Sequence, residues 1–273
     1  MQWGGDLARG AHWILVAAAV LAGSAARAQP AAVPPGDCRL SDAGTATVAK
    51  VLDARTVTLS DGRELRLAGI EAPQRDEPHA EGARSALERL AAGRELVLRR
   101  LGTETDRHGR VLAHVFAGSE PGGRSLQQHL LASGDARVAA RVGDLACARG
   151  LLAAESSARG SGLGLWKLPY YAVRQAENPG EIAAERGRFA VVEGKVLSVR
   201  EAGSTVYVNF GRRWSEDFTV TVLKRHERGF AAEGLELRRL AGRHVRVRGT
   251  VEERGGPWIE AVRPEQFEIA GRD

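Results

Sequence analysis

The sequence predicts a mainly β fold with some α-helix, an α+β chain of two small β-barrels, the first packed against helices. Three features support this. Short runs of alternating apolar and polar residues occur in both halves of the chain. Helical spacing is confined to a few stretches, and a segment rich in Pro and charged residues separates the halves. With 273 residues, of which 43% are hydrophobic, the chain can bury two cores.

The first 28 residues have the features of a secretory signal peptide. Arg9 lies in a short basic segment, an apolar run extends to Ala22, and Ala26-Arg27-Ala28 offers a small-x-small cleavage site. The run is shorter than the ~18–20 apolar residues of a membrane span. We therefore expect export to the periplasm or beyond, cleavage near Ala28, and no membrane span in the mature chain. Residues 29–43 are predicted to be a Pro-rich tether.

Residues 44–168 are predicted to form the first domain. Its strand-like segments alternate in polarity and cover residues 45–51, 56–59, 64–67, 95–101 and 111–116. An Asp61-Gly62 hairpin signal joins the second and third of these segments. Its helical patterns cover residues 80–92, 126–132 and 145–158. Short strands interleaved with helices indicate a small closed barrel with helices packed against it.

The two cysteines are Cys38 and Cys147. Two cysteines alone cannot form a Cys-rich zinc site. In an oxidising compartment one disulfide between them is the economical interpretation, and two buried free thiols are the alternative. Neither interpretation makes them catalytic.

Residues 169–188 are predicted to be a linker, because prolines and a charged run interrupt the pattern there. Residues 189–273 form the second domain. Its five strand-like runs and one helical interruption indicate a small barrel of the OB type, a fold that binds oligonucleotides or oligosaccharides when one face is equipped for it.

Aromatic residues of the second domain could stack on bases beside arginines or fill the barrel core. The five are Tyr207, Phe210, Trp214, Phe218 and Trp258. Core positions are expected for Tyr207, Phe210 and Phe218, which fall in strand-like alternation. Trp214, with arginines before it and acidic residues after it, is the one whose exposure decides between the two interpretations.

Charge and histidine content say little about function. The formal net charge is +5, and only four of the 39 basic residues are lysines. A guanidinium suits phosphates and carboxylates better than an ammonium, but this total identifies no partner. Six histidines lack the spacing of metal ligands and are expected at surfaces or turns: His79, His108, His114, His129, His226 and His244.

Three motifs in register carry a resemblance to a known family. They are Asp53-Ala54-Arg55-Thr56, residues 65–74 and residues 106–113, with a closing Gly-Leu-Gly-Leu-Trp at 162–166. Together they resemble the staphylococcal nuclease family, the thermonuclease-like proteins. The second domain resembles, more loosely, the OB-like domain appended to many bacterial members.

The resemblance implies an OB-type five-stranded barrel and calcium-assisted hydrolysis of phosphodiesters. Arg66 and Arg110 match the family's two phosphate-binding arginines, and Glu71 matches a metal-binding aspartate. These residue types suit the chemistry. Hard cations prefer clustered carboxylate oxygens, and guanidinium groups stabilise charge that develops on phosphoryl oxygens.

Two positions depart from the family pattern. Arg55 stands where a second metal-binding carboxylate belongs, and Gln74 stands where the catalytic glutamate belongs. Glutamine cannot accept a proton near neutral pH, although it can orient a water. A guanidinium in place of a carboxylate makes the site two charges more positive, which opposes a divalent ion. Calcium-dependent hydrolysis is therefore expected to be lost or strongly reduced. We expect no cofactor, and Ca²⁺ only if some nuclease activity is retained.

Two arrangements of Arg55 stay open. With Arg66 and Arg110 it would form a metal-free phosphate or anion site, or it would fold back onto Glu71 in a structural ion pair. The leading functional hypothesis is an exported protein that binds nucleic acid, single-stranded in preference to double-stranded, or another polyanion. The alternatives are a slow metal-dependent phosphodiesterase and a scaffold for protein partners.

Overall fold

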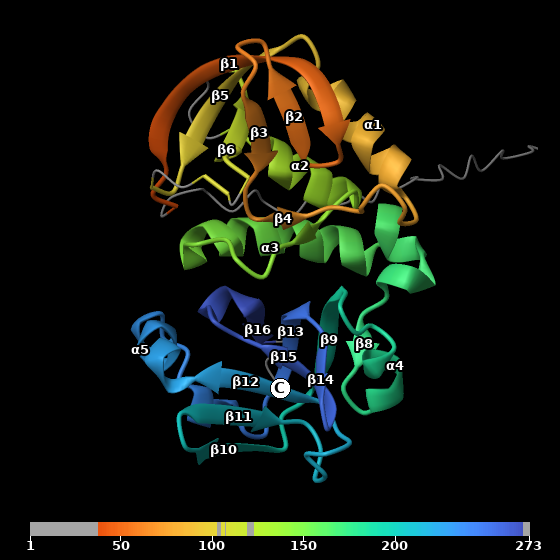
Figure 1. Ribbon diagram of the computed structural model, residues 1–273, viewed down its shortest axis with the longest axis vertical. Coiled ribbons are helices and arrows are strands. Elements are labelled where there is room, and N and C mark those ends of the chain that lie inside the picture. The colour runs from red at the N-terminus through yellow and green to blue at the C-terminus, as the bar shows by residue number, and fades with distance from the viewer. Residues whose placement is uncertain (1–37, 103–104, 107, 119–122, 270–273) are drawn as a thin grey trace, which may run out of the picture. The chain divides into compact units, whose positions relative to one another are not determined.

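Five strands from the first half of the chain close into a barrel in the computed structural model (Figure 1). They are hydrogen-bonded in the order β1-β2-β3-β6-β5, and β5 returns to β1. Their bounds are β1 (Ser41–Asp53), β2 (Thr56–Leu59), β3 (Glu64–Leu67), β5 (Glu95–Arg100) and β6 (Val111–Ala117). The predicted α+β fold with a five-stranded OB-type barrel is confirmed.

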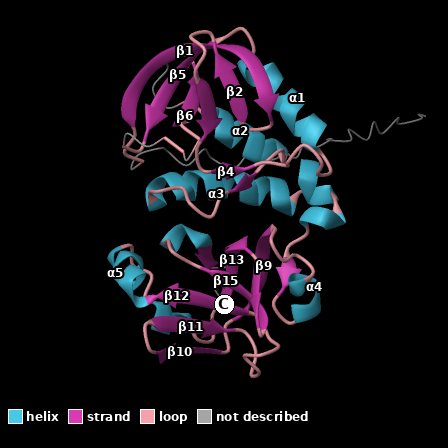
Figure 2. Ribbon diagram, viewed as in Figure 1, coloured by secondary structure: helices cyan, strands magenta, loops and turns pink. Residues whose placement is uncertain are grey.

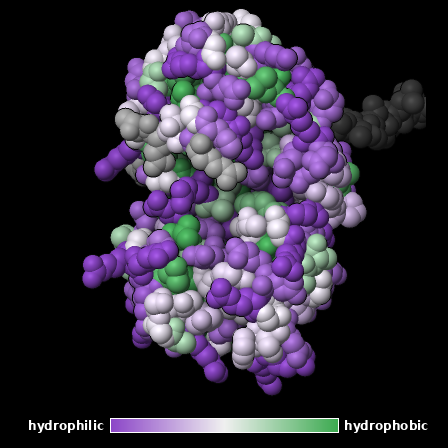
Figure 3. All heavy atoms as spheres, viewed as in Figure 1, coloured by the Kyte–Doolittle hydropathy of each residue, from purple (hydrophilic) through white to green (hydrophobic). Residues whose placement is uncertain are grey.

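The structure describes residues 38–102, 105–106, 108–118 and 123–269. The predicted signal peptide and most of the predicted tether lie outside these residues. Within the described ranges, no helix is both long and apolar enough to cross a membrane. Hydrophilic side chains cover most of the molecular face in Figure 3, because the apolar ones are gathered in two cores.

The long strand β1 closes the barrel because it pairs with both β2 and β5. Its first half pairs with β5 and its second half pairs with β2, and the register is irregular within each half. The Asp61-Gly62 turn joins β2 to β3, and Gly62 supplies the left-handed backbone, with a φ of 85°. On β3, Leu65 and Leu67 are buried in the core while Arg66 between them is partly exposed. Strand alternation thus sets the direction of Arg66.

Three helices accompany the barrel (Figure 2): α1 (Ala80–Ala91), α2 (Leu126–Ser133) and α3 (Leu145–Gly160). Helix α1 packs against β1, α2 packs against β6, and α3 packs against α2. Ser125 begins α2 with a capping box to Gln128, and Asp144 begins α3 by accepting a hydrogen bond from the Cys147 amide. A two-stranded sheet, β4 (Ile70–Glu71) with β7 (Arg137–Val138), lies outside the barrel and pairs Glu71 with Arg137. A short 3₁₀ helix, η1 (Gly164–Lys167), follows α3.

Two sheets around one core form the second domain, a barrel-like arrangement in agreement with the small OB-like barrel that the sequence predicts. One sheet has the order β10-β11-β12-β15-β14 and the other β16-β13-β9-β8. The strands are β8 (Arg174–Gln175), β9 (Phe189–Lys195), β10 (Ser198–Ala202), β11 (Thr205–Asn209), β12 (Thr219–Leu223), β13 (His244–Thr250), β14 (Glu252–Arg254), β15 (Gly256–Glu260) and β16 (Phe267–Ile269). The helices are α5 (Lys224–Ala232), η3 (Leu237–Leu240) and η4 (Pro264–Gln266).

The predicted linker, residues 169–188, has structure of its own. It contains η2 (Pro169–Tyr171), β8 and α4 (Pro179–Ala183). Tyr171 and Ile182 are buried, and β8 pairs with β9 of the second domain. The segment therefore belongs to the packed structure, because apolar side chains that follow its prolines reach the interior.

The aromatic residues of the second domain divide between core and surface. Phe218 is fully buried, and Phe210 packs against the core. The core position expected for Tyr207 is wrong: Val206 and Val208 on either side of it are buried, so Tyr207 lies on the outer face of β11. The Trp214 side chain is 74% exposed.

Cys38 and Cys147 form a disulfide, with 4.6 Å between their Cα atoms. The bond ties the residues before β1 to the first turn of α3. The disulfide interpretation is confirmed, and the structure contains no free thiol among its described residues.

A buried ion pair joins the two domains, which lie in one compact unit, Val33–Asp273. The Arg248 guanidinium on β13 donates to both carboxylate oxygens of Glu155 on α3, at 2.9 and 3.1 Å. Their side chains are 1% and 0% exposed. Glu155 also accepts from the Val138 amide and from Arg159, each at 2.5 Å. Burial favours the neutral acid, but the Arg248 charge and these hydrogen bonds outweigh it and lower the pKa of Glu155.

Removal of one partner should destabilise the protein more than removal of both. Glu155→Leu leaves the Arg248 guanidinium buried without its main partner and should lower the free energy of unfolding by about 3–5 kcal/mol. The double variant Glu155→Leu with Arg248→Met should recover part of that loss, because no charge is stranded. Urea denaturation of the single and double variants measures both effects, and a double variant as unstable as the sum of the two single variants would contradict this role.

His114 corrects the expectation that the histidines lie at surfaces or turns. It is on β6, is 3% exposed, and its Nε2 atom is buried without a hydrogen-bond partner among the described residues. Burial lowers its pKa from 6.5 to about 4, against a smaller opposing effect of Asp144. The side chain is therefore neutral in the folded protein at neutral pH.

Acidification should destabilise the fold through His114. The unfolded chain takes up a proton below pH 6.5 whereas the folded chain resists protonation until about pH 4. The free energy of unfolding should therefore fall between these values, by about 3 kcal/mol in all. Denaturation midpoints of the native protein and of His114→Leu, measured from pH 7 to pH 4, should diverge as the pH falls. Parallel curves would exclude His114 as the cause.

Candidate functional site

Arg55 and Glu71 form an ion pair at the mouth of the barrel. Arg55 lies in the turn between β1 and β2, where its amide donates to the Asp53 carboxylate at 2.9 Å. Its guanidinium Nη1 donates to Glu71 Oε2 at 2.5 Å and to the Ile70 carbonyl at 3.2 Å. The two side chains are only 17% and 24% exposed. Of the two arrangements open from the sequence, the ion pair with Glu71 is the one that forms.

Arg66 is a half-buried cation without an ion pair. It lies on β3, directly opposite Thr56 of β2, and its side chain makes no hydrogen bond or salt bridge to any described residue. Burial lowers its pKa, and the positive charges of Arg55 and Arg110 lower it further, while Glu71 opposes them. The three arginines therefore act on one another electrostatically, although Arg55 is also paired.

Arg110 is held by a turn of the chain before β6. The Asp106 carboxylate accepts from the Arg110 amide at 3.0 Å and from its Nε at 2.6 Å. It also accepts from the His108 amide. Burial opposes the Asp106 charge, but the Arg110 hydrogen bonds prevail and the pKa of Asp106 is lowered. The Asp-x-x-Gly-Arg sequence thus fixes the direction of its own arginine.

Gln74 stands in an exposed turn after the buried Ala72 and Pro73. Its backbone N–H donates a hydrogen bond to the Glu77 carboxylate at 2.9 Å. The side chain itself makes no hydrogen bond to a described residue. It is therefore free to bind a ligand or water but is not positioned by the protein.

The carboxylates around Glu71 do not gather into a calcium site. Asp53 is turned to the Arg55 amide, and Glu77 accepts from the Tyr170 hydroxyl at 3.0 Å. Within the described residues, the one group of three potential metal ligands contains Cys38 and Cys147, which are joined as a disulfide. The donor set that a hard cation requires is therefore not assembled at Glu71.

Arg137 is a site residue that the sequence analysis missed. It is 7% exposed and stands opposite Glu71 in the β4–β7 pair. Its guanidinium lies between the rings of Tyr171 and Phe189, at 4.9 and 4.8 Å from their centres, and donates to the Phe189 carbonyl at 3.1 Å. Burial lowers its pKa. A two-residue strand carries no periodic signal, so only the fold reveals this arginine.

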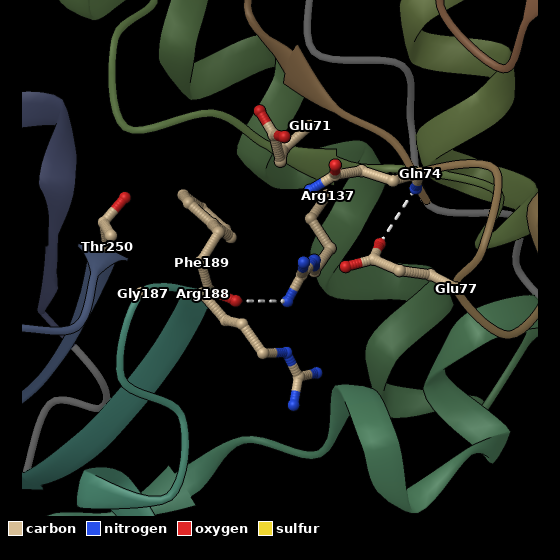
Figure 4. A pocket seen from close by; sticks show the side chains of 8 residues that line it. All are labelled: Glu71, Gln74, Glu77, Arg137, Gly187, Arg188, Phe189 and Thr250. Atoms are coloured by element: carbon tan, nitrogen blue, oxygen red, sulfur yellow. Dashed lines mark hydrogen bonds between the residues drawn. The ribbon is translucent and has the colours of Figure 1, made fainter.

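Arg137 lines a cavity of about 160 Å³ that both domains share. Figure 4 shows its side chain extending toward the Phe189 carbonyl, away from the Glu71 carboxylate. The walls are Glu71, Gln74, Glu77, Arg137, Gly187, Arg188, Phe189 and Thr250. The second domain thus covers one side of the Glu71–Gln74 turn.

These features define a class of protein: a small closed β-barrel with three arginines close enough to act on one another electrostatically. A comparison of the sequence with family models makes the assignment specific, because residues 64–168 match the model described as staphylococcal nuclease homologue. The chain therefore carries a staphylococcal nuclease homologue domain, which confirms the resemblance of its motifs. The match includes Arg66, Glu71, Gln74 and Arg110, but it leaves Arg55 and the whole second domain outside. No curated protein matches the sequence.

Exchange of Arg55 for a carboxylate should create calcium binding. Arg55→Asp removes the guanidinium from Glu71 and adds a second carboxylate to the same mouth of the barrel, which is the donor type that Ca²⁺ prefers. Isothermal titration with CaCl₂ should give saturable binding for the variant and none for the native protein. Arg63→Asp makes the same charge change in the exposed β2–β3 hairpin and should bind no calcium. Equal binding by the native protein would contradict this account of the site.

Proposed function

We propose that the barrel domain binds phosphate groups of nucleic acid, or of another polyanion, through Arg66 and Arg110, without efficient calcium-dependent hydrolysis. The observation that carries the proposal is Arg66 itself. It is a half-buried guanidinium, it has no carboxylate partner among the described residues, and two neighbouring cations act on it. A phosphate placed there would compensate the charge of Arg66, relieve the repulsion from its two neighbours and accept charge-assisted hydrogen bonds.

The state of the remaining positions argues against the family's hydrolytic chemistry. Arg55 forms an ion pair with the Glu71 carboxylate, which is the group that a metal ion would need as a ligand. Gln74 cannot act as a base near neutral pH. The cation at position 55 and the amide at position 74 both favour retention of a phosphate over its cleavage, so Ca²⁺ has no part in the proposed function.

Single strands are the preferred form of nucleic acid in this proposal. Duplex binding depends on extended neutralisation of two phosphate backbones, and no long basic helix or Arg-rich arm is present in the described residues. We further propose that the protein acts outside the cytoplasm after cleavage near Ala28, which rests on the sequence of residues 1–28.

A 5′-phosphorylated dinucleotide is the sharpest probe of this cleft, because it offers phosphates with few bases to stack. Titration in the presence of a chelator should show binding that weakens by about tenfold in Arg66→Ala and in Arg110→Ala, the loss of one charge-assisted contact. Arg63→Ala removes an exposed arginine that pairs with Asp61 and should leave the affinity unchanged.

The same samples test hydrolysis. Labelled single-stranded DNA and RNA should stay intact when calcium replaces the chelator. Calcium-dependent cleavage that disappears in Arg66→Ala and Arg110→Ala would overturn the proposal in favour of an active phosphodiesterase. Failure of every polyanion to bind would overturn it in favour of a protein scaffold.

A further inference from the structure

The five-stranded sheet of the second domain has a polar outer face with aromatic side chains on it. Val206, Val208 and Val222 point inward and are fully buried, so the residues that alternate with them point outward. The register then aligns Arg200, Tyr207 and Thr221 in one row across three strands. Trp258 on β15 occupies the same face one row away, opposite Thr219.

Two tryptophans and an arginine lie around the turn between β14 and β15, at one end of this sheet. The Arg254 guanidinium lies over the Trp258 ring, 5.5 Å from its centre. Trp214, in the loop between β11 and β12, packs beside Gly255: a Cβ atom at that glycine would lie 3.6 Å from the indole Cζ3. Trp214 is 74% exposed, the most exposed large hydrophobic side chain among the described residues. We call Arg200, Tyr207, Trp214, Arg254 and Trp258 the aromatic–arginine face.

The arginines of this face have no carboxylate partner among the described residues, although Arg254 lies over the Trp258 ring. Arg200, Arg254 and the neighbouring Arg212 form no ion pair with any described carboxylate, in contrast to Arg213, which pairs with Glu216. Their guanidinium groups are therefore available to a ligand. Exposure of the apolar indole of Trp214 to water is unfavourable. A ligand that covers this ring is therefore stabilised by apolar burial and by stacking.

The balance of charges on this face indicates which ligand it suits. Glu252 lies opposite Trp258, and Glu260 lies opposite Thr221. These carboxylates weaken attraction for the two phosphate backbones of a duplex, on which duplex affinity depends. Base stacking on aromatic rings and guanidinium planes is less sensitive to charge and needs unpaired bases.

We propose that the aromatic–arginine face binds single-stranded nucleic acid by stacking bases on Trp214 and Tyr207, with Arg254 and Arg200 beside them. This site is separate from the phosphate cleft of the barrel domain. It reads bases, whereas the cleft reads phosphates.

The test compares a labelled 12-nucleotide single strand with an abasic strand of the same length, bound to the full chain in chelator. The native protein should bind the base-bearing strand about tenfold more tightly than the abasic strand. The double variant Trp214→Ala with Arg254→Ala should bind both strands equally. Arg239→Ala removes an exposed arginine that pairs with Glu236, and it should behave as the native protein does.

The outcomes separate the two proposals. Arg66→Ala should weaken the base-bearing and the abasic strand alike, because it acts on phosphate contacts only. The inference about the aromatic–arginine face is overturned if the native protein binds both strands equally or binds a duplex more tightly than a single strand. It is overturned as well if the double variant keeps the preference for bases.

Discussion

The buried Glu155 carboxylate sets the arrangement of the whole structure. A fully buried acid stays ionised only where several donors reach it, and these donors come from three different elements. The Val138 amide comes from β7, Arg159 from α3 itself, and Arg248 from β13 of the second domain. The second domain therefore supplies one of the charges that balance Glu155, and the same carboxylate holds β7 through the Val138 amide.

Strand β7 has only two residues, so the hydrogen bond that holds Val138 also fixes the position of Arg137. Val138 binds Glu155, and Arg137 beside it stands opposite Glu71 on β4. The Glu71 carboxylate in turn accepts a hydrogen bond from the Arg55 guanidinium. A continuous series of contacts thus leads from the domain junction to the mouth of the barrel. The cavity that Arg137 lines exists because this series brings the Glu71–Gln74 turn against the second domain.

Sequence patterns predicted the parts of this structure that depend on local alternation. The five barrel strands, the three helices and the Asp61-Gly62 turn all follow from residue spacing, and Arg66 and Arg110 follow from motifs. Tyr207 was misplaced because alternation gives two faces without saying which one is buried. His114 was misplaced because a scattered histidine carries no periodic signal. Arg137, Arg248 and the partner of Arg55 depend on contacts between residues far apart in sequence, which spacing alone does not specify.

The arginines illustrate why net charge is a poor guide to function in this chain. Arg55, Arg110 and Arg248 each have a carboxylate within hydrogen-bond distance, so their charges are already compensated within the fold. Arg66 and Arg254 have none among the described residues, yet one is half-buried under repulsion from other cations and the other lies on a tryptophan ring. An anion relieves the first situation, and a stacked base fits the second. The two surfaces proposed to bind ligands are therefore marked by arginines without a carboxylate partner among the described residues. The number of arginines in the chain does not identify them.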